Sequence, residues 1–201
     1  MPAITSPINK AVVLRGVTAA AFPKLLGAVM YEHEQKVCLA VPAATPVTVG
    51  VRVIRSNGTG LLDFEYRLSM PESDYDDGIR LVVTFGGRKF AISFADFRAD
   101  LPGAIPPNSF GSDPNEHAVF RFDYGLSVGR PARACFISTN GREFDKTGGR
   151  VSLFTGQRSI SFEAPAPTAL AVSTYMPHFV PEEPALPGTM ETPTASNDDA
   201  S

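Results

Sequence analysis

Residues 79–94 read IRLVVTFGGRKFAISF, two apolar runs on either side of the pair Gly86-Gly87. Two adjacent glycines accept the backbone conformation of a two-residue β-turn, so the runs are expected to pair as a hairpin. In this register one face of the hairpin is almost wholly apolar. Its expected cross-strand pairs are Phe85 with Arg88, Val83 with Phe90, Leu81 with Ile92 and Ile79 with Phe94. A shift of one residue would turn these side chains to water. The pattern therefore predicts two strands with a common core face.

A second apolar alternation surrounds Asn57-Gly58, a dipeptide typical of tight hairpin turns. A two-residue turn there predicts the inward pairs Val53 with Leu62, Val51 with Phe64, Val49 with Tyr66 and Val47 with Leu68, with Arg52 opposite Asp63 on the other face. A third hairpin is predicted around Gly156-Gln157. Its register pairs Leu153 with Ile160 and Val151 with Phe162.

Further short strands are predicted at 11–14, 37–41, 120–128, 132–139 and 168–176. About nine or ten short strands joined by glycine-containing turns, without alternating helices, indicate an all-β protein with an antiparallel β-sandwich. A jelly-roll or Greek-key arrangement is expected, and an up-and-down barrel is the alternative.

One short helix is expected near the N-terminus, at residues 18–35. Pro23 suits a first helical turn, and apolar side chains recur on one side at helical spacing. These side chains are Phe22, Leu25, Leu26, Val29 and Met30. The helix is expected to cover an edge or a face of a sheet, and one or two further helical turns are predicted within 94–101.

The length of 201 residues and a hydrophobic content of 43% favour one domain with a substantial core. We expect an N-terminal arm at 1–10, a single β-sandwich domain at 11–176 and a Pro-rich acidic tail at 177–201. The tail has five prolines, five acidic residues and neither Lys nor Arg. Such a composition cannot bury enough apolar surface to order itself in an isolated subunit.

The formal net charge of −3 and the 19% of charged residues give no strongly basic surface, so strong nucleic-acid binding is not expected. The chain has no run of about 18 apolar residues, and no membrane span is predicted. The N-terminal residues also lack the apolar core of a secretory signal. The expected location is a virion or the cytoplasm, not secretion through a signal peptide.

Catalytic motifs are absent from the sequence: it has no nucleophile elbow, phosphate-binding loop, dinucleotide fingerprint or zinc-protease motif. Asp63, Glu65 and Asp123 are expected on outward strand faces next to basic residues, as cross-strand charge pairs and not as catalytic carboxylates. The chain is therefore predicted not to be an enzyme, with no catalytic residue, cofactor or metal site.

Three further features concern binding or reactivity. Asp74, Asp76 and Asp77 precede Gly78 and are expected to form an acidic turn. No glutamate follows at EF-hand spacing, so calcium binding by 74–77, which stays open, would need distant ligands. The histidines His33, His117 and His178 are far apart in the sequence and are expected at the surface. Cys38 and Cys135 lie in apolar runs and are expected to be unpaired thiols, both buried.

Candidate partner-contact residues are the aromatic side chains outside clear strand patterns and one apolar group in the tail. These are Tyr31, Tyr75, Phe110, Tyr175, His178, Phe179 and Val180. The combination of strands, long loops and terminal arms predicts a structural assembly protein, most plausibly a viral coat or virion decoration subunit. Its partners would be copies of itself or another shell subunit. The alternative is a non-catalytic module that binds glycan, calcium or peptide through loops 70–78 and 102–117.

Overall fold

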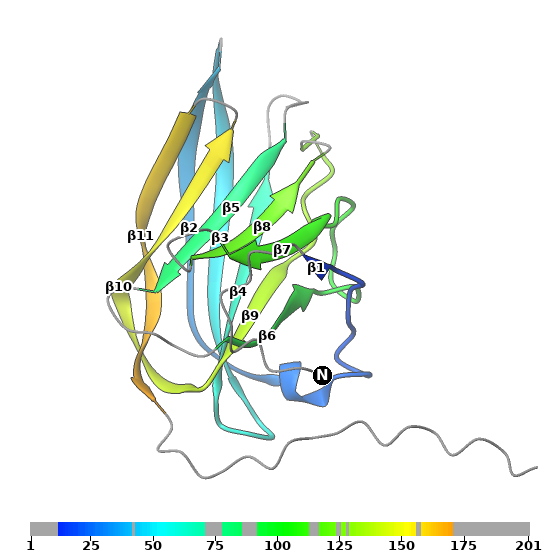
Figure 1. Cartoon of the computed structure of the whole chain (residues 1–201), viewed down its shortest axis with the longest axis vertical. Coiled ribbons are helices and arrows are strands. Elements are labelled where there is room, and N and C mark those ends of the chain that lie inside the picture. The colour runs from blue at the N-terminus through cyan, green and yellow to red at the C-terminus, as the bar shows by residue number, and fades with distance from the viewer. Residues whose placement is uncertain are drawn as a thin grey trace, which may run out of the picture.

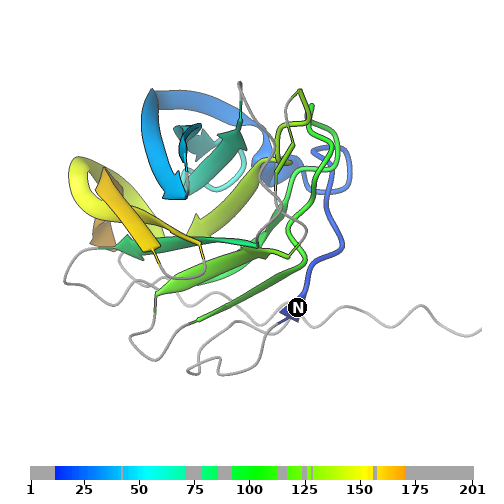
Figure 2. The same cartoon turned by 90° about the horizontal axis from the view of Figure 1, so that it is seen from above.

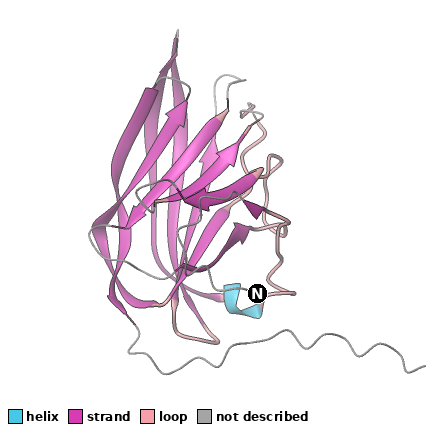
Figure 3. Ribbon diagram, in the orientation of Figure 1, coloured by secondary structure: helices cyan, strands magenta, loops and turns pink. Residues whose placement is uncertain are grey.

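The computed structural model describes residues 12–41, 43–70, 78–85, 92–112, 117–123, 126–127, 129–155 and 158–170. Strands account for nearly all of the regular structure in these ranges, as Figure 3 shows, which confirms the all-β prediction. The predicted arm at 1–10, the acidic turn at 74–77, the turn at Gly86-Gly87 and the tail at 177–201 lie outside the described residues.

The strands form two antiparallel sheets (Figure 1). The six-stranded sheet has the order β1 (Val12–Val13), β7 (Ser109–Ser112), β8 (Ala118–Phe122), β5 (Ile79–Phe85), β10 (Gly141–Thr155) and β11 (Arg158–Leu170). The five-stranded sheet has the order β2 (Gly27–Val41), β3 (Ala43–Ser56), β4 (Leu62–Ser69), β9 (Cys135–Thr139) and β6 (Ile92–Phe97).

The two sheets lie as layers on either side of one hydrophobic core, as the view from above shows (Figure 2). Phe64 of β4 and Phe85 of β5 meet across the layers with their ring centroids 5.1 Å apart. The alternation of β3 explains its place in this core, because Val47, Val49, Val51 and Val53 all point inward and are at most 2% exposed. Each such valine stabilises the fold by about 1.5–3 kcal/mol.

The predicted hairpin at residues 79–94 is wrong, because β5 and β6 belong to different sheets. Leu81 lies between Leu153 of β10 and Phe120 of β8, whereas Ile92 pairs with Thr139 of β9. Alternation identifies the apolar face of a strand but not the strand beside it. In a two-layer fold, two runs with inward faces can therefore meet through the core and not through backbone hydrogen bonds.

A β-bulge in β6 also changes which side chains of this strand face inward. The register shift falls between Ile92 and Phe94. Ile92 packs against the core, while the Phe94 ring stacks on Phe22, outside the core, with ring centroids 4.9 Å apart. The bulge therefore turns one predicted core residue to the outer face of the sheet.

The hairpin at Asn57-Gly58 is formed, but its register differs by two residues from the prediction. Val53 pairs with Phe64 and Val51 with Tyr66. The connection is longer than two residues, since the Gly60 amide donates to the Ser56 carbonyl. A shift of two keeps every side chain on its predicted face. Arg52 consequently lies opposite Glu65 and not opposite Asp63.

The third hairpin has the predicted register, with Leu153 opposite Ile160 and Val151 opposite Phe162. The strand pair continues well beyond these residues, past a bulge between Asp145 and Gly149. The turn at 156–157 itself lies outside the described residues. Here both strands come from one short stretch of sequence, so local pattern was sufficient to align them.

The predicted helix at 18–35 is wrong. A single 3₁₀ turn at Pro23–Leu25 is followed directly by the 15-residue strand β2. The apolar side expected to pack on a sheet is largely at the surface, since Leu26 is 51%, Val29 54% and Met30 45% exposed. Pairing of β2 with β3 along its length, with Val37 packed into the core, overrides the helical spacing.

Other boundaries differ from the prediction in smaller ways. The expected helical turns within 94–101 are the end of β6 and a bend, and the connection at 102–116 contains β7. The strand predicted at 120–128 ends at Phe122, and that predicted at 132–139 begins at Cys135. Pro46, expected in a loop, lies within β3.

Gly60 is expected to be the glycine that the β3–β4 connection requires, since its φ is +67°. Replacing Gly60 with Ala should cost about 1 kcal/mol of unfolding free energy, because a Cβ disfavours the left-handed conformation. The measurement is equilibrium unfolding in urea.

Gly58→Ala is the matched control, because a Cβ would meet no atom within 4 Å at either glycine and only Gly60 has a positive φ. The control should unfold within a few tenths of a kcal/mol of the parent. Equal destabilisation by both substitutions would contradict this assignment of the turn.

Candidate functional site

The outer face of the five-stranded sheet contains charged side chains that are almost fully buried. Asp63 and Glu65 of β4 are 5% and 2% exposed, and Asp96 and Arg98 at the end of β6 are 7% and 8% exposed. Charged residues are rarely buried to this extent unless they are paired. This group is called the charged cluster below.

The segment 14–26 lies over the charged cluster and is attached to the end of β6 by hydrogen bonds. These bonds join Gly16 N to Asp96 Oδ1 (3.0 Å), Val17 N to Phe97 O (2.9 Å), Ala99 N to Val17 O (2.8 Å) and Ala19 N to Asp100 Oδ2 (2.9 Å). Gly16 has a φ of +75° and lies against the Phe97 ring. The aspartates thus hold backbone amides of the covering segment.

Glu65 is the centre of an ionic network on this face. Its Oε1 accepts from Arg67, with a nitrogen–oxygen distance of 2.8 Å to Nη2, and lies 3.8 Å from Arg52 Nη1. Its Oε2 lies 3.8 Å from Arg98 Nη1. Arg52 also pairs with Glu32 on β2. Three guanidinium groups therefore compensate the loss of water around this buried carboxylate.

Arg98 and Asp100 form a bidentate pair, with Nε to Oδ1 at 2.8 Å and Nη2 to Oδ2 at 3.0 Å. The hydrogen bonds from Arg98 lower the pKa of Asp100 to about 2, although burial acts in the opposite direction. The same pairing raises the pKa of Arg98. Asp100 is therefore ionised at any pH at which the fold is expected to persist.

Asp63 lacks such compensation. Burial raises its pKa from 3.8 to about 6, against the smaller opposing effects of Ser138, Lys24 and Arg98. Neither Asp63 Oδ2 nor Ser138 Oγ has a hydrogen-bond partner of good geometry. Burial likewise lowers the pKa of Lys24, whose Nζ lies 5.1 Å from the centre of the Phe94 ring. Asp63 thus carries a desolvation cost whenever it is ionised.

The charged cluster has a structural effect: it fastens the segment 14–26 to the sheet. The sequence analysis placed Asp63 and Glu65 correctly on an outward face beside basic residues, but it did not anticipate their burial. Lys24, Asp96 and Arg98 were missed, because nothing local indicates that residues about 80 positions apart meet. Within the described ranges, no three His, Cys, Asp or Glu side chains gather as a metal site would require.

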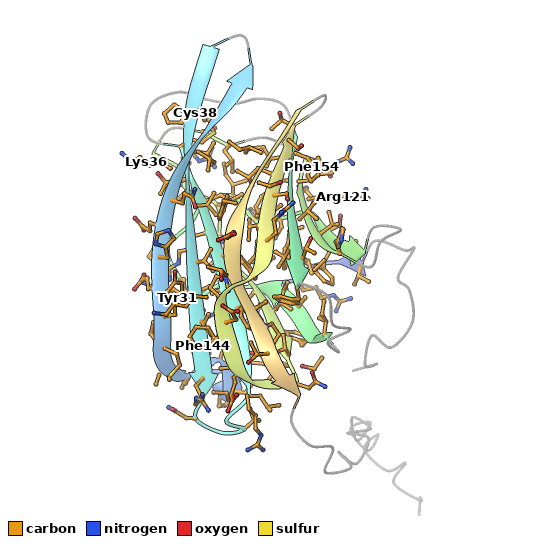
Figure 4. All side chains as sticks on the ribbon, turned by 90° about the vertical axis from the view of Figure 1, so that its left-hand side faces the viewer. Tyr31, Lys36, Cys38, Arg121, Phe144 and Phe154 are labelled. Atoms are coloured by element: carbon orange, nitrogen blue, oxygen red, sulfur yellow. The ribbon has the colours of Figure 1, made fainter. Side chains whose placement is uncertain are left out.

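Tyr31, a predicted partner contact, is half-buried on β2 where this strand approaches β10. Its ring lies 6.0 Å from the Phe144 ring, and Lys146 Nζ lies 5.7 Å from its centre (Figure 4). His33 lies next to it, with ring centroids 6.3 Å apart. Much of the Tyr31 ring is therefore in contact with its own chain.

Phe110, another predicted partner contact, is only 3% exposed and packs on Phe120 with ring centroids 4.9 Å apart. Its ring belongs to the core and is not part of an exposed surface. The remaining predicted contacts, Tyr75, Tyr175, His178, Phe179 and Val180, lie outside the described residues. So does most of loop 70–78, whereas residues 102–112 of the second predicted binding loop are described.

A different group of apolar side chains is exposed. Leu26, Val29 and Met30, called the edge patch below, lie at the beginning of β2. This strand is the outermost of its sheet, and a bulge lies between Val29 and Tyr31. The sequence analysis had placed these three residues on the packed side of a helix. In the strand they are at the surface.

The two cysteines are both unpaired but differ in exposure. Cys135 is buried in β9, and burial strongly raises the pKa of its thiol. Cys38 is exposed on β2, so the prediction that it is buried is wrong. The alternation of β2 indicates why, since Val37 points into the core and its neighbour must point out.

The helical residues that the structure describes form one three-residue turn, Pro23–Leu25. The described part of the chain therefore contains no helix long and apolar enough to cross a membrane.

Asp63→Asn should stabilise the fold at neutral pH. The folded-state pKa of Asp63, about 6, lies above its ordinary value of 3.8, so protonation favours the fold and stability is lost as pH rises from about 4 to 6. The variant should exceed the parent by roughly 1–3 kcal/mol at pH 7 and approach it near pH 4. Urea unfolding at a series of pH values measures this difference.

The matched control is Asp123→Asn, because Asp123 is exposed on the other sheet. It gives the effect of removing one exposed carboxyl group, against which the effect at Asp63 is compared. A pH-independent difference for Asp63→Asn would contradict the assignment of the raised pKa to this carboxyl group.

Thiol labelling should distinguish the cysteines. A thiol reagent should modify Cys38 rapidly in the native protein and Cys135 only after denaturation, because a buried thiol with a raised pKa is unreactive. Two thiols should be counted in denaturant without reductant, and Cys38→Ser should abolish the rapid phase. Rapid modification of both would show that β9 is open to solvent.

Comparison with protein-family models, with curated proteins and with solved structures finds no match to this chain. Its function is therefore inferred from the arrangement of its own residues.

Proposed function

We propose that this chain is a structural subunit of a protein shell, such as the coat or decoration of a virus particle, and that it associates with copies of itself. The order of the strands is the observation that carries this proposal. The chain passes from one sheet to the other between β1 and β2, β4 and β5, β5 and β6, β6 and β7, β8 and β9, and β9 and β10. As a result, β5 lies between β8 and β10, and β9 lies between β4 and β6.

We take this interleaving of two antiparallel sheets as support for a jelly-roll or Greek-key arrangement; jelly rolls occur in viral capsid proteins, lectin domains and cupins. An architecture shared by several functions does not by itself choose among them. A second feature of the surface is needed, and the edge patch supplies it.

The edge patch supports assembly over the binding of a small ligand. Leu26, Val29 and Met30 are each about half exposed; Val29 and Met30 lie on β2, Leu26 directly precedes it, and no described strand pairs with the outer edge of β2. Contiguous exposed apolar residues are typical of protein–protein contacts. An unpaired strand edge also offers backbone groups to another chain. The proposed role is structural and not catalytic, and its place would be the virion, or the cytoplasm before assembly.

The mass of the protein in solution tests this function. Sedimentation velocity over a range of concentrations should show assemblies well above the 21.5 kDa of one chain. A monodisperse monomer at all concentrations would contradict self-association and would favour the alternative of a binding module that uses loops 70–78 and 102–117.

Charging the edge patch should prevent assembly without unfolding the subunit. Val29→Lys/Met30→Lys places two ammonium groups on exposed positions, so the thermal midpoint should change little while the assembled fraction falls at least tenfold. Circular dichroism and sedimentation of the same sample measure the two effects.

Val12→Lys/Val13→Lys is the matched control, because these valines are exposed on β1 at the edge of the other sheet and the change in charge is the same. The control should assemble like the parent. Equal loss in both variants would indicate general charge repulsion, and unchanged assembly of the Val29/Met30 variant would rule out the edge patch as the contact.

A further inference from the structure

Two arginines lie directly opposite each other on the outer face of the six-stranded sheet. Arg80 of β5 is paired with Arg121 of β8, and both side chains are exposed. Like charges at directly opposed positions of neighbouring strands destabilise a sheet. Neither guanidinium forms an ion pair with another residue that the structure describes. Among the described residues, the fold therefore presents two positive charges side by side without a paired carboxylate.

An exposed aromatic ring extends the arginine pair. Phe154 of β10 lies opposite Arg80 and is 40% exposed. Figure 4 shows Arg121 and Phe154 on the same side of the molecule. A row of directly paired residues crosses strands β7, β8, β5, β10 and β11 of this sheet. In this order the residues are Ser109, Arg121, Arg80, Phe154 and Ser159. This row, called the arginine row below, combines cations, an apolar ring and two hydroxyl groups.

Two acidic side chains near the arginine row are described, and neither is paired with its arginines. Asp123 lies two residues beyond Arg121 on β8, and Glu163 lies opposite Arg150, farther along the sheet. Neither forms an ion pair with a described residue. An extended acidic ligand with apolar groups would fit the row better than a neutral one, because guanidinium groups bind carboxylates strongly.

The chain itself contains a segment with this composition. Residues 177–201 include five of the 21 acidic residues and no Lys or Arg, which leaves 16 acidic against 18 basic residues in the rest of the chain. Glu182 and Glu183 follow Phe179 closely, so two carboxylates and an aromatic ring occur within five residues. The charge and the spacing of apolar and acidic groups complement the arginine row.

We propose that the arginine row receives residues 177–201 of a second copy of this chain, with Glu182 and Glu183 on the two arginines. The inference rests on the proposed function in one respect, that a second copy is the donor. The segment that follows β11 in the sequence would then link neighbouring subunits. The edge patch and the arginine row would be two separate contacts of one assembly.

A labelled synthetic peptide of residues 177–201 tests the proposal through its fluorescence anisotropy. The receiver is the full chain with Glu182→Lys/Glu183→Lys, so that its own C-terminal segment is repelled from the arginine row and does not compete. Saturable binding that weakens as salt is raised is expected. Adding Arg80→Glu/Arg121→Glu to the receiver should weaken binding at least tenfold.

The matched control adds Arg130→Glu/Arg142→Glu, which changes the charge equally at two exposed arginines outside the row. Binding should then equal that of the unaltered receiver. Absence of saturable binding, or equal weakening by the two pairs of substitutions, would overturn the proposal. So would a single-stranded oligonucleotide that binds the row more tightly than the peptide, because the occupant would then be nucleic acid.

Sedimentation of the parent chain separates this inference from the proposed function. Peptide binding that depends on Arg80 and Arg121, together with a parent that stays monomeric, would support the recognition of the segment and contradict the shell. Assembly of the parent without peptide binding would leave the shell intact and overturn the role of the arginine row.

Discussion

The burial of two apolar sheet faces against each other is the interaction on which the rest of this structure depends. Contacts such as that of Phe64 with Phe85 join strands that share no backbone hydrogen bond. Because the chain crosses between the two layers several times, no run of consecutive strands forms either sheet alone. The chain must bring distant segments together before either sheet is complete. The apolar contacts of the core offset the entropy cost of this step only when both layers are present.

The charged cluster shows how the outer face of one layer is closed. A sheet face that carries Asp63, Glu65 and Asp96 would ordinarily remain in water. Here the segment 14–26 covers it, and the aspartates at the end of β6 hold the backbone amides of that segment. Glu65 is surrounded by guanidinium groups, whereas Asp63 keeps an unpaired oxygen. The free-energy cost of burying a charge is thus compensated at Glu65, whereas it remains uncompensated at Asp63.

The surfaces that remain open differ between the two sheets. Both sheets expose apolar side chains at an outermost strand, and the six-stranded sheet also exposes an arginine pair beside an aromatic ring on its outer face. Contacts through two unlike surfaces are heterologous and lead to rings, closed shells or filaments, in contrast to the self-complementary contact of a twofold dimer. In the shell that we propose, the two surfaces would contact different neighbouring subunits.

The sequence by itself determined which residues face the core in most strands, the register of the hairpin of Val151 with Phe162, and the absence of a long helix bundle or alternating βαβ units. It placed the side chains of β3 and β4 on the correct faces despite a two-residue error, because faces repeat every two residues. Only the tertiary structure decided the partners of β5, the strand at Gly27–Val41, the exposure of Cys38 and the burial of Phe110 and Asp63. Alternation and turn residues are local, whereas the choice of neighbouring strand, and the covering of an outer face, depend on contacts between segments far apart in the chain.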